Sequence, residues 1–259
     1  MAYTRKEMYS RHGIEFDGDR KVKYNGEWIP LFLKEGNNKT GKLVYTFSLP
    51  AGTNGTCVCD CEGCYAKTGM YKTPDVITSN KRNQWFVEND IDFLYRAISA
   101  QLETLRGKVT EIRIHASGDF HTANSREYAA LWRRIVSENP DFLFWTYTKM
   151  EEFESLFDGL ENGNIVKSVI DGIGINYGHV GYVIDTYWKL RKAGAAVYIC
   201  RCGIDKNQHC HNCHHCATTE FVLFIEHSTK YVAEKDSRYS ELLELIAMQD
   251  RENMEGMIA

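Results

Sequence analysis

The sequence predicts an α/β fold in which a parallel sheet forms a partial (βα)6 TIM-like barrel. From Lys42 onward, short apolar segments alternate with segments of helical periodicity, which is the pattern of βαβ crossovers. The chain has 259 residues, 43% of them hydrophobic, which is enough for one large domain with a sizeable core. We therefore expect a short β-rich hairpin extension over residues 1–41 and a single barrel-like domain over 42–259, with a Cys-rich loop near the C-terminus.

The expected elements follow in order along the chain. Asn25-Gly26 lies between two short apolar/polar alternations, which predicts a β-hairpin in the extension. Helices are expected where apolar residues recur at helical spacing, over 90–106, 125–138, 151–160, 181–192 and 238–252. Strands are expected over 43–49, 112–117, 142–148, 166–176, 195–199 and 221–225. In a parallel sheet of this kind the reactive groups gather at the carboxyl ends of the strands.

Charge and hydropathy exclude several classes of function. The formal net charge of −4 argues against broad nucleic-acid binding, because such binding needs a basic surface. No apolar segment approaches the roughly 20 residues of a membrane span, so we expect no membrane contact. The N-terminus lacks the apolar region of a signal peptide, and the expected compartment is the cytoplasm. The expected partners are a small-molecule or nucleotide substrate and a reductant protein.

The nine cysteines fall in two clusters, four between Cys57 and Cys64 and five between Cys200 and Cys216. A disulfide framework spreads its cysteines along a short secreted chain. Two compact clusters in a chain of this length instead indicate metal or iron–sulfur ligation. Each cluster directly follows an expected strand, which predicts that both lie at the carboxyl edge of the sheet.

In the first cluster, Cys57, Cys61 and Cys64 have the spacing C-x3-C-x2-C. Three thiolates on one loop can bind three irons of a 4Fe–4S cluster and leave the fourth iron open, whereas an electron-transfer cluster usually has four cysteines. Cys59 is an alternative fourth ligand, and a zinc site made from the same thiolates is the alternative to iron. The spacing favours the iron–sulfur interpretation.

The C-x3-C-x2-C motif after the first strand of a βα barrel resembles the radical S-adenosylmethionine (SAM) superfamily. The resemblance implies that SAM binds the open iron and is cleaved reductively to a 5′-deoxyadenosyl radical. In that superfamily a Gly-Gly-Glu-like turn after the second strand holds the SAM amine, and here the turn reads Ser117-Gly118-Asp119. Nearby, His115 either faces the substrate or packs beside the barrel wall.

Further segments resemble a phage and mobile-element family known as gene product eighty-eight. They are 42–52, Cys64-Tyr65-Ala66, 116–120 and 145–148, and the resemblance covers roughly residues 40–228. Members of this family are described as radical-SAM-like or iron–sulfur proteins. The resemblance therefore implies a phage-encoded metalloprotein that works in the cytoplasm of the host.

In the second cluster, Cys202, Cys210, Cys213 and Cys216 have a ferredoxin-like spacing, with Cys200 as the alternative to Cys202. The same thiolates can hold a structural zinc, alone or with an imidazole. A third arrangement shares one of these cysteines with the first cluster. The interleaved histidines are expected to be solvated or to lie behind the ligands, because enough thiolates are present without them.

Three functions are compatible with these observations. The favoured one is a radical-SAM-like 4Fe–4S enzyme that acts on an unknown small molecule or nucleotide. The alternatives are an iron–sulfur protein without SAM, used in electron transfer or sensing, and a zinc-stabilised binding module.

Overall fold

The chain is represented by a computed structural model that describes residues 3–37, 40–59, 64–168, 177–201, 204–205, 210, 213–225 and 233–258. Two of the expected metal ligands, Cys61 and Cys202, lie outside the described residues. From Val44 onward, α-helices separate some of the successive strands but not all: no described α-helix lies between the strands Leu143–Thr148 and Gly163–Lys167, or between Val197–Ile199 and Phe221–Ile225.

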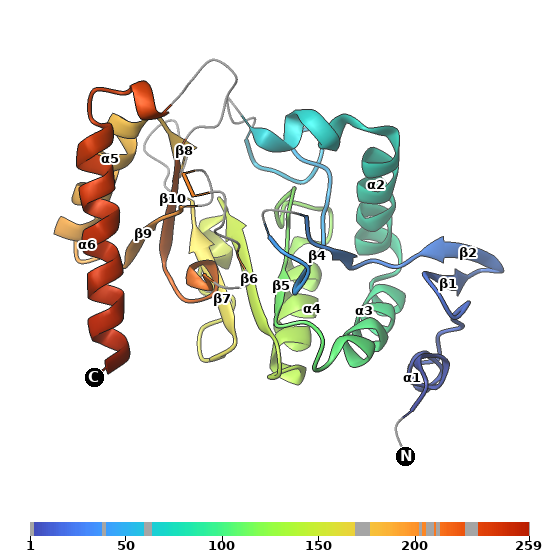
Figure 1. Cartoon of the computed structure of the whole chain (residues 1–259). Helices are drawn as coiled ribbons and strands as arrows, with labels where there is room; N and C mark the ends of the chain where they lie inside the picture. Colours follow the sequence, from blue (N-terminus) through green and yellow to red (C-terminus); the bar gives the residue numbers. More distant parts are fainter. Residues whose placement is uncertain are drawn as a thin grey trace.

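Two hydrogen-bonded sheets form the centre of the molecule (Figure 1). The larger has the order β3-β4-β5-β6-β7, in which β3 is antiparallel to β4 and all other pairs are parallel. Its strands are β3 (Lys34–Glu35), β4 (Val44–Thr46), β5 (Glu111–Arg113), β6 (Leu143–Thr148) and β7 (Gly163–Lys167). The smaller is parallel, in the order β8-β10-β9, with β8 (Tyr177–Gly178), β9 (Val197–Ile199) and β10 (Phe221–Ile225).

The two sheets meet at the beginning of β10. The backbone N–H of Lys167, the last residue of β7, donates to the carbonyl of Glu220 at 2.9 Å, directly before β10 begins. Strand β10 then pairs with β8 at its end and with β9 at its beginning, so it lies between two strands that precede it in the chain. The spatial order therefore departs from the chain order at β9 and β10. The partial six-stranded barrel stays a prediction.

Helices cover one face of these strands. The larger core joins β5, β6 and β7 to α2 (Pro74–Asn89), α3 (Ile91–Leu105) and α4 (Ser125–Glu138), through residues such as Ile112 and Phe144. A second core joins β9 and β10 to α5 (Val180–Lys192) and α6 (Tyr239–Ile258). Figure 1 shows α5 and α6 beside β8, β9 and β10, α2 and α3 at the opposite side of the molecule, and α4 next to β5.

The opposite face of the strands, here called the inner face, is formed by the alternate residues. Because successive side chains in a strand point to opposite faces, Ile165 reaches the helices while Val166 does not. A separate small core joins this face across β7, β9 and β10 and also includes three cysteines of the second cluster, Cys200, Cys213 and Cys216. The residues of the inner face used below are Glu111, Trp145, Tyr147, Val166, Tyr198 and Val222.

The N-terminal segment packs on the same core as the main sheet. The hairpin is confirmed as β1 (Lys21–Tyr24) and β2 (Glu27–Pro30), with positive φ at both Asn25 and Gly26 as such a turn requires. The segment is not β-rich throughout, because α1 (Arg5–Arg11) begins at a Thr4–Glu7 capping box. The boundary between 41 and 42 stays a prediction.

Other elements also differ from expectation. Helix α2 was not expected, and its apolar periodicity is weak, although Pro74 at its first position is a typical start signal. The helix expected over 151–160 is a short 3-10 turn over Glu151–Phe153. By contrast, α4 and β10 have the predicted bounds, and α3 ends before Gly107, which has φ +71°. Among the described helices, none has a stretch long and apolar enough to cross a bilayer.

Candidate metal centre

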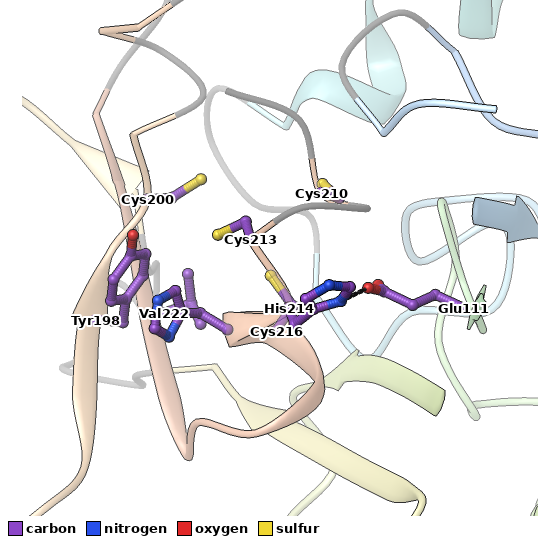
Figure 2. Close-up of a pocket in the computed structure, with 9 residues that line it drawn as sticks. Glu111, Tyr198, Cys200, Cys210, Cys213, His214, Cys216 and Val222 are labelled. Atoms are coloured by element: carbon purple, nitrogen blue, oxygen red, sulfur yellow. Dashed lines mark hydrogen bonds and ion pairs between the residues drawn. The ribbon is translucent and has the colours of Figure 1, made fainter. Parts of the chain in front are cut away.

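The second cysteine cluster lines one pocket on the inner face. Cys200 follows β9 directly, whereas Cys210, Cys213 and Cys216 lie on the connection that leads back to β10. All four line the same small pocket, together with Tyr198 and Val222 on the strands and Glu111, His214 and His215 (Figure 2). Cys200 thus lies near three cysteines of the later segment, while the ligand set expected from the sequence, which includes Cys202, stays a prediction.

Local backbone hydrogen bonds shape the segment that carries these cysteines. The N–H groups of Cys213 and His214 both donate to the carbonyl of Cys210, at 3.0 and 3.1 Å, which forms one tight turn. His214 has φ +58°, a left-handed conformation that a residue with a side chain rarely adopts. A 3-10 turn over His215–Ala217 follows, so Cys213 and Cys216 lie on either side of the left-handed residue.

Side chains from several strands hold this segment against the inner face. The hydroxyl of Tyr147 on β6 lies 3.0 Å from the sulfur of Cys216. The amide of Asn164 on β7 donates to the carbonyls of Cys216 and Thr219, both at 2.9 Å. The Tyr198 ring on β9 stacks on His215, with the ring centroids 3.7 Å apart. The segment is thus fixed by contacts that do not require a bound metal.

Burial also sets the protonation state of one thiol of this pocket, that of Cys216, when no metal is bound. Burial raises the pKa of the Cys216 thiol to about 12, so this thiol carries its proton at neutral pH. A metal must displace that proton, because thiolates are the form that ligates.

Among the described residues that line this pocket, Glu111 is the one buried acid, and no pattern in the sequence singles it out. It is the first residue of β5, and its side chain is 1% exposed. One carboxylate oxygen accepts a hydrogen bond of 2.9 Å from the indole N–H of Trp145, and the other contacts Nδ1 of His214. The alternation of apolar and polar residues that begins at Ile112 is the sequence signal beside this position, and it does not distinguish a buried carboxylate from an exposed one.

The first cysteine cluster lies on the connection between β4 and the 3-10 turn Tyr65–Lys67. Cys57 donates its backbone N–H to the carbonyl of Gly52 at 3.2 Å, and the carbonyl of Cys64 accepts from Lys67 at 3.0 Å. Cys57, Cys59 and Cys64 are each partly exposed. Because Cys61 lies outside the described residues, the three-cysteine arrangement stays a prediction.

The turn Ser117-Gly118-Asp119 ties three parts of the sheet edge together. Ser117 donates to the carbonyl of Leu49 at 2.8 Å, just after β4. A Cβ on Gly118 would lie 2.6 Å from the hydroxyl of Thr56, beside the first cysteine cluster, and its φ is +83°. The turn therefore packs so closely against the β4 connection that only glycine fits at its centre.

Asp119 uses its carboxylate to join this turn to the end of β6. It is 5% exposed and accepts from the backbone N–H of Phe120 and the hydroxyl of Thr148 on one oxygen, and from the N–H of Lys149 on the other. Burial raises the pKa of Asp119, and the hydrogen bonds oppose that rise. A role in holding a SAM amine stays a prediction, and the amine would share the carboxylate with three protein donors.

His115 does not face an open site. It is 2% exposed, its ring nitrogens lie 3.1 Å from the hydroxyl of Thr146 and 2.7 Å from that of Tyr128, and its ring packs edge-on against Phe120. Of the two interpretations, packing against the wall of the fold fits this environment. Burial lowers the pKa of His115 to about 3.

The donor chemistry of the cysteine pocket fits a thiophilic metal centre, because four sulfur atoms and no competing hard ligand other than Glu111 line it. In the described part of the chain, no three His, Cys, Asp or Glu side chains converge closely enough to bind one ion. With Cys202 outside that part, the ligand set proposed from the sequence is not tested.

The fold and this pocket together define an α/β protein with a cysteine-rich segment on the inner face of a parallel sheet. The chain belongs to the gene product 88 family, whose model matches residues 30–219, and the expected phage family is thereby confirmed. It is 30% identical over 133 residues to the Gene 88 protein of Mycobacterium phage L5, a match covering 47% of this chain and 54% of the relative. It is 26% identical over 175 residues to the Gene 88 protein of Mycobacterium phage D29, covering 58% and 71%.

The match thus spans about half the length of the phage L5 relative. No solved structure matches the chain. The relation to radical-SAM proteins stays a prediction.

Proposed function

We propose that this chain is a radical-SAM-like iron–sulfur protein that acts on a small molecule or nucleotide. Cys57, Cys61 and Cys64 would hold a 4Fe–4S cluster, and Cys210, Cys213 and Cys216, with Cys202 or Cys200, would hold a second metal centre. The observation that carries the proposal is that Cys200, Cys210, Cys213 and Cys216 line one pocket. When bound, such a cluster supplies one-electron chemistry.

One observation favours a second candidate function, an iron–sulfur protein that does not use SAM. The carboxylate of Asp119 already accepts three hydrogen bonds within the protein, and Ser117 is 3% exposed. Both residues are therefore engaged in joining the strands. A reductant protein is a partner in either case.

Anaerobic purification with iron, zinc and sulfide analysis tests the metal proposal. We expect brown protein with iron and sulfide in equal amounts. The triple variant Cys57→Ala/Cys61→Ala/Cys64→Ala should lose one centre, and Cys210→Ala/Cys213→Ala/Cys216→Ala should lose the other. Cys59→Ala tests the alternative fourth ligand: the first centre should be kept if its ligands follow the C-x3-C-x2-C spacing, and its loss would identify Cys59 as a ligand. Colourless protein with stoichiometric zinc and no sulfide would instead identify a zinc-stabilised module.

SAM titrated into the reduced protein separates the two iron–sulfur candidates. A changed electron paramagnetic resonance spectrum together with formation of 5′-deoxyadenosine supports the radical-SAM proposal. An unchanged spectrum with no 5′-deoxyadenosine leaves the second candidate.

A further inference from the structure

We infer that Glu111 is a positioning residue for the second cysteine site, acting through His214. The inference rests on the proposed function, because it concerns the metal centre proposed there. It assigns a role to a buried carboxylate that belongs to neither cysteine cluster.

The first support is the environment of the carboxylate. A carboxylate buried in the inner face of a sheet is costly unless its oxygens accept hydrogen bonds from specific donors. Glu111 has one such donor on each oxygen, the Trp145 indole on one and His214 on the other. Trp145 is itself 1% exposed and fixed in β6, so it sets the direction in which the carboxylate faces.

The second support is the position of His214 in the segment. Glu111 and His214 are 103 residues apart in the chain, and their contact joins β5 to the turn between Cys213 and Cys216. His214 is the residue with φ +58°, so its side chain leaves the backbone in a direction that an ordinary turn would not give. Figure 2 shows the imidazole directed at Glu111, away from the strands that carry Tyr198 and Val222.

The chemistry of the pair follows from these contacts. Nδ1 of His214 and one oxygen of Glu111 are hydrogen-bond partners, so the contact fixes the orientation of the imidazole relative to β5. A carboxylate that fixes one ring nitrogen of a histidine beside a metal site is a recurrent supporting arrangement. Glu111 thereby fixes the left-handed turn, and the turn fixes the separation of Cys213 and Cys216.

The molecule offers a matched control pair. Glu103 and His12 are also a carboxylate and an imidazole in contact, at 3.0 Å, and 91 residues apart in the chain. They join α3 to the residue that follows α1, remote in sequence from both cysteine clusters. Glu103→Gln and His12→Asn therefore repeat the same chemical changes at a site with no proposed metal.

The test compares Glu111→Gln, His214→Asn, the double variant and the two control variants as full-length, anaerobically prepared proteins. Metal transfer to a chromophoric chelator is followed, and the phase assigned to the second site is the one absent from Cys210→Ala/Cys213→Ala/Cys216→Ala. Asn tolerates a left-handed φ, so His214→Asn removes the imidazole without forcing the turn to change. His214 is also 44% exposed, so this variant keeps the inference testable if Glu111→Gln fails to fold.

We expect both single variants to release metal from the second site about 10-fold faster or more, the scale seen when a supporting residue of a metal site is replaced. The double variant should be no faster than the faster single variant, because the two residues act as one unit. The visible circular dichroism of the second centre should change in both single variants. A contact that only stabilises the fold elsewhere would leave this signal unchanged. The Glu103 and His12 variants should match the wild type in both measurements.

Release rates for Glu111→Gln equal to those of Glu103→Gln, or additive effects in the double variant, would overturn the inference alone. A wild-type protein without metal at this site overturns the proposed function, and the inference with it. The two failures are distinguishable because the second is seen in the wild type.

Discussion

A buried histidine makes the stability of the fold depend on pH in a defined direction. His115 is fully enclosed between β5, β6 and α4, where the hydroxyls of Thr146 and Tyr128 contact its two ring nitrogens. The charge of Arg113, the last residue of β5, acts on the His115 ring, and the charge of Asp119 acts on its neighbour Tyr128. Burial, with a smaller contribution from the Arg113 charge, lowers the pKa of His115 from 6.5 to about 3.

The sign and size of the effect follow from linkage. The folded state holds His115 neutral, whereas the unfolded chain binds a proton as pH falls through 6.5. Stability is therefore unaffected at higher pH and is lost progressively between pH 6.5 and about 3. With these two pKa values, His115 alone lowers the free energy of unfolding by about 2 kcal/mol between pH 8 and pH 5.

The assay is urea unfolding at pH 8, 6 and 5, followed by tryptophan fluorescence. Trp132 on α4 is fully buried and packs on Tyr128, so it reports on this region directly. His115→Gln keeps a polar side chain of similar reach but cannot gain a proton, and the difference between the two pH profiles isolates the histidine. A wild-type profile parallel to that of His115→Gln would refute the reasoning.

Three further substitutions test the packing described above. Gly118→Ala should lower the free energy of unfolding by more than the roughly 1–2 kcal/mol expected for a left-handed residue alone, because its Cβ would meet Leu49 and Thr56. Gly159→Ala is the control, since Gly159 also has a left-handed φ of +80° but no atom lies within 4 Å of its added Cβ. Equal loss of thermal stability in the two glycine variants would contradict this. Gln101→Ala leaves the N–H and carbonyl of Leu33 without their side-chain partner, and we expect a loss of about 2–5 kcal/mol in urea unfolding; a loss below 1 kcal/mol would contradict it. Tyr147→Phe removes the hydroxyl that lies 3.0 Å from the sulfur of Cys216. The midpoint potential of the second centre should therefore become more negative at unchanged iron content. An unchanged potential would contradict the contact.

The elements that the sequence predicted well are those whose periodicity and end signals agree. Helix α3 has apolar residues at helical spacing, the Asp90 side chain caps its first turn, and a glycine follows its end. Helix α2 is different, since its buried face includes Asn80 and Asn83, which hydrogen-bond to Ser117 and to the carbonyl of Ser48. A buried polar face has no apolar stripe, so periodicity cannot reveal it.

The candidate site also combines residues that the sequence singles out with residues that it does not. Spacing alone singled out the cysteines as candidate ligands, because a metal site needs several soft ligands close together in the chain or in space. The residues that support them, Glu111, Tyr147 and Asn164, are contributed singly by three neighbouring strands. Each is one polar or aromatic position in an otherwise ordinary strand, and only the pairing register brings the three to one segment.

The second cysteine cluster does not lie wholly at the carboxyl ends of the strands, where the sequence predicts it. Cys200 follows β9 and obeys it, but Cys216 is held by Asn164, near the beginning of β7, and its neighbour His214 is held by Glu111, the first residue of β5. The connection from β9 to the parallel neighbour β10 must return to the starting edge of the sheet, and α5 and α6 already cover the outer face of these strands. The Cys-rich connection therefore crosses the inner face, and the cysteine pocket lies against the middle of the sheet.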